Sequence, residues 1–319
     1  MNTGNTLKKS LTRLDIPKIQ VLLATYNGDR YLDIFLQSLV AQKNVDIELL
    51  VSDDGSEDTT LEIIKRFENQ FSRVRVFAGP KSGAAANFFF LLKQVDAEFC
   101  AFADQDDIWL PNHLHDSVLR LEGCNGSALT FSSVLEFETD NPEKIKTWPK
   151  YSPDNDVTSL IGENYARGCT IVMNKNAADL INLYTPRHAV MHDWWALLVV
   201  ALIGTISWSL ETEVKYRIHS SNAIGTTPRF WVRLKRYMVN LSRRDSPSFR
   251  QVIELLQAYE NHLPQQNREI FNKCRALSGN SPLSSKMRNL LRFGKVRSNT
   301  FSDLLWKCQV FFFKKGAEI

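Results

Sequence analysis

The sequence predicts an α/β fold, in which a Rossmann-like, mostly parallel sheet carries helices on both faces and a basic helical region follows. Apolar runs typical of strands alternate four times with helical patterns before residue 105, at a spacing that suits parallel βαβ units. The charge also changes sign along the chain. Residues 1–228 carry 21 Lys and Arg against 29 Asp and Glu, whereas residues 229–319 carry 18 against 6. We therefore expect an N-terminal extension (1–17), an acidic body (18–228) and a basic helical C-terminal region (229–319).

The four predicted strands lie at residues 19–24, 47–51, 74–77 and 99–103. Each is a short apolar run, and the first two lead directly into turn-forming Asn-Gly or Asp-Gly sequences. Between the strands, apolar residues recur three or four positions apart, as on one face of an amphipathic helix. Neither a GxGxxG nor a GxxxxGK[ST] motif occurs, so the usual dinucleotide fold and the P-loop are not supported.

The middle of the chain is less regular. Residues 128–131 and 168–173 are typical of strands, the second with a glycine start. Residues 136–159 are polar and weakly periodic, which predicts a long loop that is either functional or disordered, and we interpret it as a lid on the acceptor side. Residues 194–210 form an uncharged run of 17 residues, shorter than the roughly 20 that a membrane-spanning helix needs. The glycine at position 204 and the β-branched residues after it predict a helix that breaks there and then a strand, both buried.

Composition places the chain among ordinary globular proteins, with 44% hydrophobic and 23% charged residues. The five cysteines are odd in number and show no CxxC spacing, which favours reduced thiols in a cytoplasmic protein over a disulfide framework. Residues 1–18 are polar and contain no apolar core of signal-peptide length.

Three carboxylates follow the fourth predicted strand, at Asp104, Asp106 and Asp107. Carboxylates that are crowded at the end of a strand repel each other unless a positive charge lies among them. A hard divalent cation binds one or two carboxylates and takes its other ligands from substrate phosphates and water. The motif therefore indicates a metal–phosphate site, and the alternative is a solvated acidic turn.

Polar residues also follow the first two strands, at Thr25 and Tyr26 and at Asp53 and Asp54. Because the carboxyl ends of parallel strands meet at one edge of the sheet, these residues should lie near the acidic motif. An Asp there can accept a hydrogen bond from the imide N–H of uracil or thymine, and a Tyr can stack on the base. The alternative for the Asp pair is a plain turn.

Lys81 and Asn87 flank the next loop and the start of a helix, where phosphate or ribose contacts are expected. The alternative for Lys81 is a solvated surface charge.

Together, three ordered motifs resemble the family 2 glycosyltransferases of the GT-A fold, which transfer sugars from nucleotide diphosphate donors with inversion. The motifs are Ala-Thr-Tyr-Asn-Gly at residues 24–28, Val-Ser-Asp-Asp-Gly-Ser at 51–56 and Phe-Ala-Asp-Gln-Asp-Asp-Ile-Trp at 102–109. The resemblance covers roughly residues 18–225. It implies that Asp53 and Asp54 hold the donor base and that Thr25 and Tyr26 line the nucleotide pocket. It also implies that Asp104 and Asp106 bind Mg²⁺ or Mn²⁺ on the diphosphate.

The same resemblance places Gly168 and Cys169 beside the acceptor pocket and makes Asp193 the general base. A base on the face opposite the leaving diphosphate gives inversion, and aromatic neighbours such as Trp194 and Trp195 raise its pKa by desolvation. The alternative is that Asp193 only caps the helix that Trp194 begins.

Near the end of the body, Arg217 can bind diphosphate charge, and the resemblance makes His219 a third metal ligand. The Tyr-Arg-x-His-x-x-Asn pattern with Asp-Trp-Trp resembles the rhamnosyltransferase-like branch, which uses dTDP-L-rhamnose for O-antigen or capsule assembly. The expected partners are a dTDP- or UDP-sugar and a glycan or lipid-linked saccharide acceptor. The alternatives are a sugar nucleotidyltransferase and a non-catalytic scaffold with this fold.

Residues 229–319 combine apolar and cationic sides at helical spacing, which is typical of helices that bind an anionic membrane surface. We therefore expect peripheral attachment to the inner face of the cell membrane. The alternative is that these helices pack on the acidic body or on a second subunit in a homo-oligomer. Nucleic acid is not an expected partner, because no recognised binding module accompanies the charge.

Overall fold

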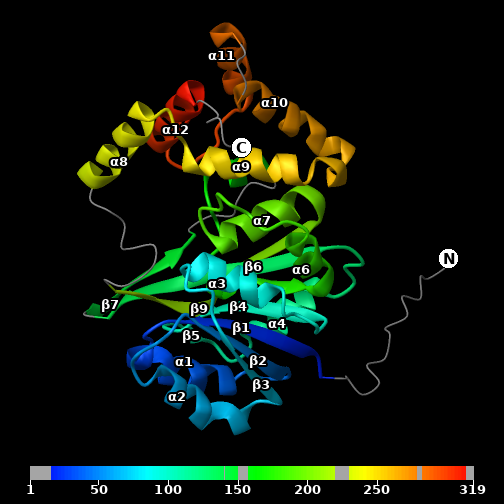
Figure 1. The fold of residues 1–319 in the computed structure, drawn as a ribbon, viewed down its shortest axis with the longest axis vertical. Helices are drawn as coiled ribbons and strands as arrows, with labels where there is room; N and C mark the ends of the chain where they lie inside the picture. The colour runs from blue at the N-terminus through cyan, green and yellow to red at the C-terminus, as the bar shows by residue number, and fades with distance from the viewer. Residues whose placement is uncertain (1–15, 140, 150–156, 220–229, 279–281, 314–319) are drawn as a thin grey trace, which may run out of the picture.

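The computed structural model describes residues 16–139, 141–149, 157–219, 230–278 and 282–313. A nine-stranded mixed sheet occupies one end of the molecule and a group of C-terminal helices the other, with α7 (His192–Ile203) between them (Figure 1). The strand order is β3-β2-β1-β4-β8-β6-β9-β5, with β7 added on β6. The predicted α/β class is therefore confirmed.

The first half of the sheet is parallel, as predicted. It contains β1 (Lys18–Thr25), β2 (Asp46–Asp53), β3 (Arg73–Ala78) and β4 (Phe99–Asp104). The connecting helices are α1 (Asp29–Val40), α2 (Thr60–Phe67) and α3 (Ala84–Leu92). In the register, Thr25 lies opposite Asp53 and Ala24 opposite Asp104, so the polar ends of β1, β2 and β4 are level with one another.

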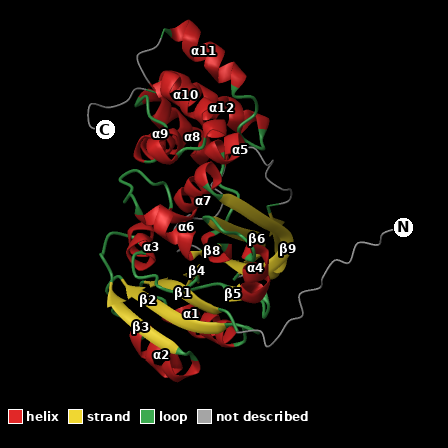
Figure 2. Ribbon diagram, turned by 90° about the vertical axis from the view of Figure 1, so that its right-hand side faces the viewer, coloured by secondary structure: helices red, strands yellow, loops and turns green. Residues whose placement is uncertain are grey.

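Both faces of this half are covered, which explains the continuous apolar runs in the strands. On β1, Leu22 packs into the core under α3 and α7, whereas Val21 and Leu23 pack into the opposite core under α1 and α2. Figure 2 shows α1 and α2 on one side of the sheet and α3 and α6 (Lys175–Asn182) on the other. Successive side chains on a strand point to opposite faces, so β1, β2 and β4, which are buried on both sides, are mostly apolar. The buried exceptions Gln20 and Glu48 lie opposite each other, and Gln20 donates a hydrogen bond to Glu48 over 3.0 Å.

The second half of the sheet is mixed. It contains β5 (Ile108–Trp109), β6 (Ala128–Glu138), β7 (Asn141–Trp148), β8 (Val172–Asn174) and β9 (Thr205–Ile218), with α4 (His113–Leu121) and α5 (Val157–Gly162) in the connections. β8 runs antiparallel to β4 and to β6, and β9 runs parallel to β6. The sheet is therefore parallel only in part.

Two predictions about this half were wrong in detail. The expected loop at 136–159 is in its first part a hairpin of β6 and β7, because charged strand residues such as Glu136 find partners in Arg167 and Lys146. The strand predicted at 168–173 begins instead as a 3₁₀ turn, Gly168–Thr170, before β8. Residues 150–156 lie outside the described residues.

α7 and β9 confirm the predicted helix, break and strand, but the expected burial of the strand was wrong, because Thr205 and Leu210 of β9 are exposed. Ten of the twelve residues of α7 are buried, which explains why the run is uncharged. The helix ends at Gly204, where an added Cβ would lie 2.2 Å from the backbone oxygen of Ser127. Among the described residues, no helix is long and apolar enough to cross a membrane.

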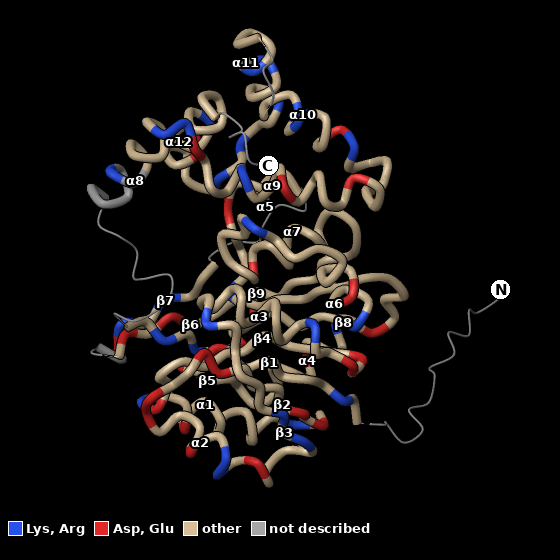
Figure 3. The backbone as a smooth tube through the Cα atoms, in the orientation of Figure 1, with Lys and Arg blue, Asp and Glu red and all other residues tan. Residues whose placement is uncertain are grey.

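The basic region is helical, as predicted. Its helices are α8 (Phe230–Ser242), α9 (Pro247–Ala258), α10 (Arg268–Ser278), α11 (Leu283–Arg292) and α12 (Thr300–Phe312). Phe249 and Leu255 of α9 share one core with Leu197 of α7, so this region packs on the body through apolar contacts. Figure 3 shows Lys and Arg spread over the outer helices α10, α11 and α12. The predicted boundary near residue 228 lies outside the described residues.

Candidate functional site

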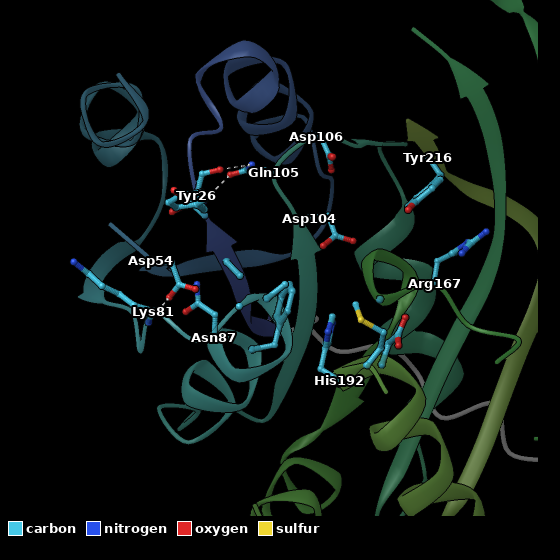
Figure 4. Close-up of a pocket in the computed structure, with 18 residues that line it drawn as sticks. Tyr26, Asp54, Lys81, Asn87, Asp104, Gln105, Asp106, Arg167, His192 and Tyr216 are labelled. Carbon is cyan, nitrogen blue, oxygen red and sulfur yellow. Dashed lines mark hydrogen bonds between the residues drawn. The ribbon is translucent and has the colours of Figure 1, made fainter. Parts of the chain in front are cut away.

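A cavity of about 520 Å³ opens at the carboxyl ends of β1 and β4 (Figure 4). Of the residues predicted for a site, nine line it: Thr25, Tyr26, Asp54, Lys81, Asn87, Asp104, Asp106, Gly168 and Asp193. They come from segments up to about 170 residues apart in the chain, which the strand register and α7 bring together. This is the edge of an α/β sheet at which ligands bind in such folds.

Gln105, between the two carboxylates of the acidic motif, joins the loops at the ends of β1 and β4. Its side-chain oxygen accepts a hydrogen bond from the N–H of Tyr26, and its side-chain N–H₂ donates to the carbonyl of Tyr26, each over 3.1 Å. An added Cβ on Gly28 would lie 2.2 Å from the same side-chain oxygen, so this glycine leaves room for the contact. This role of Gln105 was not predicted from the sequence.

Asp53 and Asp54, at the end of β2, make different contacts. Asp53 is buried, and its oxygens accept hydrogen bonds from the Thr25 hydroxyl (2.8 Å), the Ser56 hydroxyl (2.6 Å) and the N–H groups of Gly55 and Ser56. Burial opposes its ionisation, but these hydrogen bonds outweigh it and lower the pKa of Asp53. Asp54 is the one that lines the cavity, where its Oδ1 accepts from the N–H of Lys81 over 3.1 Å.

The next loop closes the same side of the cavity. Lys81 has a positive φ of 54°, which folds the loop tightly over Asp54. Asn87 in α3 is buried, and its side-chain N–H₂ donates to the carbonyl of Ser52 over 2.9 Å. Its side-chain oxygen has no hydrogen-bond partner among the described residues, although Asn87 lines the cavity.

Asp104, the last residue of β4, lies deep in the cavity. Burial, with the neighbouring carboxylates of Asp106 and Asp193, raises the pKa of Asp104 to about 8, and Arg167 opposes this increase. Asp106 lies beside His219, whose Nε2 is 2.6 Å from the carboxylate oxygen Oδ2. The fold therefore joins the acidic motif to the end of β9, more than a hundred residues away.

A second acidic cluster was not predicted. Ligand atoms of Asp104, Asp107 and Cys169 lie within 4.8 Å of one another. Asp107 is fully buried; one of its oxygens accepts the N–H of Arg217 over 2.9 Å, and the other has no hydrogen-bond partner among the described residues. Burial, and then Asp107 and Asp104, raise the pKa of the Cys169 thiol, which keeps it neutral.

These groups suit a hard divalent cation. Such a cation prefers carboxylate oxygens, and a neutral thiol is a poor ligand for it. Burial and the nearby carboxylates of Asp106 and Asp193 raise the pKa of Asp104, and a bound cation would favour its charged form. The predicted set of Asp104, Asp106 and His219 supplies two carboxylates and one imidazole, which suits Mg²⁺ or Mn²⁺ by ligand type. Among the described residues, however, the three ligand atoms that lie within 4.8 Å of one another belong to Asp104, Asp107 and Cys169.

Asp193 lies in the first turn of α7 and lines the cavity. The helix begins at His192, two residues earlier than the cap alternative assumes, and the cap position belongs to Met191. Asp193 is 5% exposed, and burial raises its pKa to about 6, with the Trp194 N–H and Arg167 opposing the shift. This carboxylate can take up a proton near neutral pH.

Six predicted residues do not line the cavity. Asp53, Cys169, Arg217 and His219 lie behind lining residues, whereas Trp194 and Trp195 are buried in the core. Successive helical residues are about 100° apart, so only one of the three residues in the Asp-Trp-Trp sequence can face the cavity squarely. Trp194 donates its indole N–H to the carbonyl of Leu160 over 2.8 Å, which fixes α5 against α7.

Several lining residues were missed by sequence reasoning: Gly83, Ala84, Phe88, Gln105, Arg167, Met191, His192 and Tyr216. Arg167 illustrates why. Its guanidinium lies over the rings of Trp148 and Tyr216, at 4.2 and 4.9 Å from their centres, and it pairs with Glu136. These partners come from three strands, and nothing in the local sequence around Arg167 signals the contact.

Comparison with known proteins identifies the family of the chain. The model of the family described as Glycosyl transferase family 2 matches residues 20–180. The dTDP-rhamnosyl transferase RfbG of Shigella flexneri is 29% identical over 228 residues, which cover 67% of this chain and 77% of that protein. A Campylobacter jejuni GalNAc(5)-diNAcBac-PP-undecaprenol beta-1,3-glucosyltransferase is 28% identical over 145 residues, which cover 45% of this chain and 46% of that protein.

Two solved structures share the fold. TarS 1–349 of S. aureus, in complex with UDP-GlcNAc, has a TM-score of 0.53 at 16% identity and covers 92% of this chain and 89% of its own. The mannosyltransferase PcManGT from Pyrobaculum calidifontis, in complex with GDP-Man and Mn²⁺, has a TM-score of 0.50 at 15% identity and covers 93% and 85%. At these identities the likeness concerns the fold, and it agrees with the GT-A fold expected from the sequence.

Proposed function

The chain belongs to glycosyltransferase family 2, and we propose that it is an inverting enzyme that transfers L-rhamnose from dTDP-rhamnose to a hydroxyl of a glycan or lipid-linked acceptor in cell-surface polysaccharide assembly. The observation that carries the proposal is the cavity that Asp54, Asp104 and Asp193 line together. It offers separate groups for a base, a diphosphate and an acceptor. The choice of rhamnose is supported by the Shigella relative.

The donor nucleotide is proposed to lie against the ends of β1 and β2. Tyr26 is 59% exposed, and its ring is free to stack on a base, while Asp54 offers an oxygen to the imide N–H of thymine or uracil. Asp53 supports the site indirectly, because its hydrogen bonds to Thr25 and Ser56 hold the two loops together. Lys81 and Asn87 are within the same wall and are proposed to contact phosphate or ribose.

The diphosphate is proposed to bind at Asp104 and Asp106 through Mg²⁺ or Mn²⁺, with His219 as a further ligand. When bound, the cation neutralises charge that develops on the leaving diphosphate. Arg217 is mostly buried, and its Nε donates to the carbonyl of Asp106 over 2.8 Å, which positions the acidic loop. Its guanidinium also lies over the ring of Tyr31, 4.5 Å from its centre.

Asp193 is proposed to remove the proton from the acceptor hydroxyl. Because its pKa of about 6 lies near the working pH, the carboxylate is charged at neutral pH and still basic enough to accept a proton. The hydroxyl oxygen then attacks the anomeric carbon from the side opposite the diphosphate, so the configuration is inverted. Gly168 and Met191 border the carboxylate and leave space for the acceptor.

A donor screen with product identification tests the proposal. The full chain is incubated with Mn²⁺, a saccharide acceptor and a panel of dTDP-, UDP- and GDP-sugars, and release of nucleoside diphosphate is measured. Asp193→Asn should abolish transfer while donor affinity stays nearly unchanged. Release of pyrophosphate would indicate a nucleotidyltransferase instead, and turnover of no sugar nucleotide would favour a non-catalytic scaffold.

We also propose that α11 attaches the protein to an anionic membrane surface. Leu283, Met287 and Leu291 are 65%, 46% and 75% exposed, and their spacing of four residues places them on one face of the helix. Exposed Arg288 and Arg292 flank this stripe. An apolar stripe beside cations matches the interface of a bilayer with anionic lipids.

Point variants test this better than deletion of residues 229–319, because α9 contributes to the main core. Leu291→Ser and Arg288→Glu should reduce sedimentation with phosphatidylglycerol-containing vesicles. Leu183→Ser, which removes an exposed leucine from the body, serves as the matched control and should bind like the wild type. Equal binding by all variants would exclude α11 as the attachment site.

A further inference from the structure

His192 is the lining residue whose chemistry the proposed mechanism leaves unused. It begins α7 next to Asp193, is only 2% exposed and borders the cavity. Both of its ring nitrogens lack a hydrogen-bond partner among the described residues. Buried polar groups in folded proteins are nearly always hydrogen-bonded, so an imidazole without partners at a cavity wall indicates a missing ligand.

Packing holds this imidazole in one orientation. It stacks on Phe88 at 3.8 Å between ring centres and 20° between planes, and it meets the edge of Phe102 at 4.8 Å. In Figure 4 the ring rises from the start of α7 toward Asp104. The direction of the imidazole is therefore fixed before any ligand binds. A side chain that is held in this way can recognise one particular polar group of a ligand.

Gly168 keeps one nitrogen accessible. An added Cβ at this position would lie 2.9 Å from Nε2 of His192 and 3.4 Å from Cε1. This glycine has no positive φ, so the backbone conformation does not require it. The lack of a side chain at position 168 instead leaves space beside the imidazole of His192.

The neighbours of His192 favour a sugar hydroxyl as the ligand. Burial lowers the pKa of His192 to about 3, so the ring is neutral and offers one N–H donor and one acceptor nitrogen. A hydroxyl group can satisfy both kinds of nitrogen, whereas a phosphate oxygen only accepts. Phe88, Ala84 and Met191 line the same wall and can pack against the C–H face of a sugar ring.

We propose that His192 hydrogen-bonds a ring hydroxyl of the transferred sugar and so helps to select the donor. The donor sugar is favoured over the acceptor, because the imidazole is packed on α3, whose start also forms the proposed nucleotide wall at Ala84 and Asn87. This inference rests on the proposed glycosyl transfer. His192 is thereby a specificity-determining residue beside the base.

The test compares His192→Phe with the wild type on a series of monodeoxy donors. Phenylalanine keeps an aromatic ring that can stack on Phe88 and removes both ring nitrogens. We expect kcat/KM for the full donor to fall about tenfold to a hundredfold. For the one donor that lacks the bound hydroxyl, wild type and variant should be equally active. His192→Gln, which restores a donor and an acceptor, should recover part of the loss.

Two further measurements separate the possible outcomes. Affinity for the free nucleoside diphosphate with Mn²⁺ should be unchanged in His192→Phe, whereas affinity for the intact sugar nucleotide should fall. This binding readout does not depend on turnover, so it judges His192 even if the proposed acceptor is wrong. Gly168→Ala, which fills the space at Nε2, should show the same donor pattern.

An equal loss with every deoxy donor would mean that His192 has only a structural role, and no loss in either variant would remove it from the site. Equalisation with a deoxy acceptor, instead of a deoxy donor, would overturn the assignment to the transferred sugar.

Discussion

Replacing Asp193 with asparagine should make the protein more stable while it abolishes transfer. In the folded protein, burial raises the pKa of Asp193 from 3.8 to about 6. Between these two values the folded state binds the proton that the unfolded state has released, so this group's contribution to stability is lost as the pH rises through this range. Above pH 6 the buried charge opposes folding in full, and a difference of about 2 pKa units corresponds to about 3 kcal/mol.

Asparagine keeps the shape of the side chain and carries no charge. At pH 7.5 the variant should therefore gain up to about 3 kcal/mol in the free energy of unfolding, and at pH 5 about half of that. In a chain of this size the larger value raises Tm on the order of 5 °C. Thermal unfolding of both proteins, followed by circular dichroism at the two pH values, measures the effect.

Asp58→Asn is the matched control of opposite sign. Burial raises the pKa of Asp58, but hydrogen bonds from Thr60 and Asp29 outweigh this and lower it, so the charged form is favoured in the folded state. Its removal should lower Tm at pH 7.5. If Asp193→Asn lowered Tm by the same amount at both pH values, the carboxylate would be stabilised by its surroundings, and the reasoning about its basicity would fail.

Three other perturbations follow from the same geometry. The pH profile of kcat/KM should fall tenfold per unit below about pH 6, where Asp193 becomes protonated; a flat profile down to pH 5 would argue against it as the base. Gln105→Ala removes two hydrogen bonds to Tyr26, and KM for the donor should rise about tenfold in steady-state assays, with Gln37→Ala on the exposed face of α1 as a neutral control. Gly204→Ala places a Cβ against the carbonyl of Ser127 and should reduce the free energy of unfolding by about 1–3 kcal/mol in urea titrations; an unchanged midpoint would show that the α7–β9 turn relaxes freely.

Chelation tests the proposed metal site directly. Treatment with EDTA should abolish transfer, and added Mn²⁺ should restore it, because Asp104 and Asp106 need a cation to hold a diphosphate. A metal-binding titration of Asp106→Asn should show weaker Mn²⁺ binding than the wild type. Full activity in EDTA would leave the acidic motif without its proposed role.

The sequence by itself determined the parallel half of the sheet and the positions of the acidic residues. Apolar runs such as residues 19–24 are buried on both faces, and their neighbours carry turn signals, so the local pattern contains enough information to locate strands and their ends. Because parallel strands end at one edge, the order of the strands and their polar ends was sufficient to predict that Asp54 and Asp104 lie near each other. The helices at the end of the chain could also be predicted, from their basic charge and from the helical spacing of their apolar residues.

Only the tertiary structure decided which of these residues share a cavity and which support it. Asp53 and Asp54 are adjacent and chemically identical, yet the register of β1 and β2 turns one toward Thr25 and leaves the other at the cavity. His192 and Gln105 carry no local signal of their roles, which depend on partners many residues away. The physical reason is that periodicity and turn propensity act over a few residues, whereas contacts between distant side chains are set by strand register and core packing.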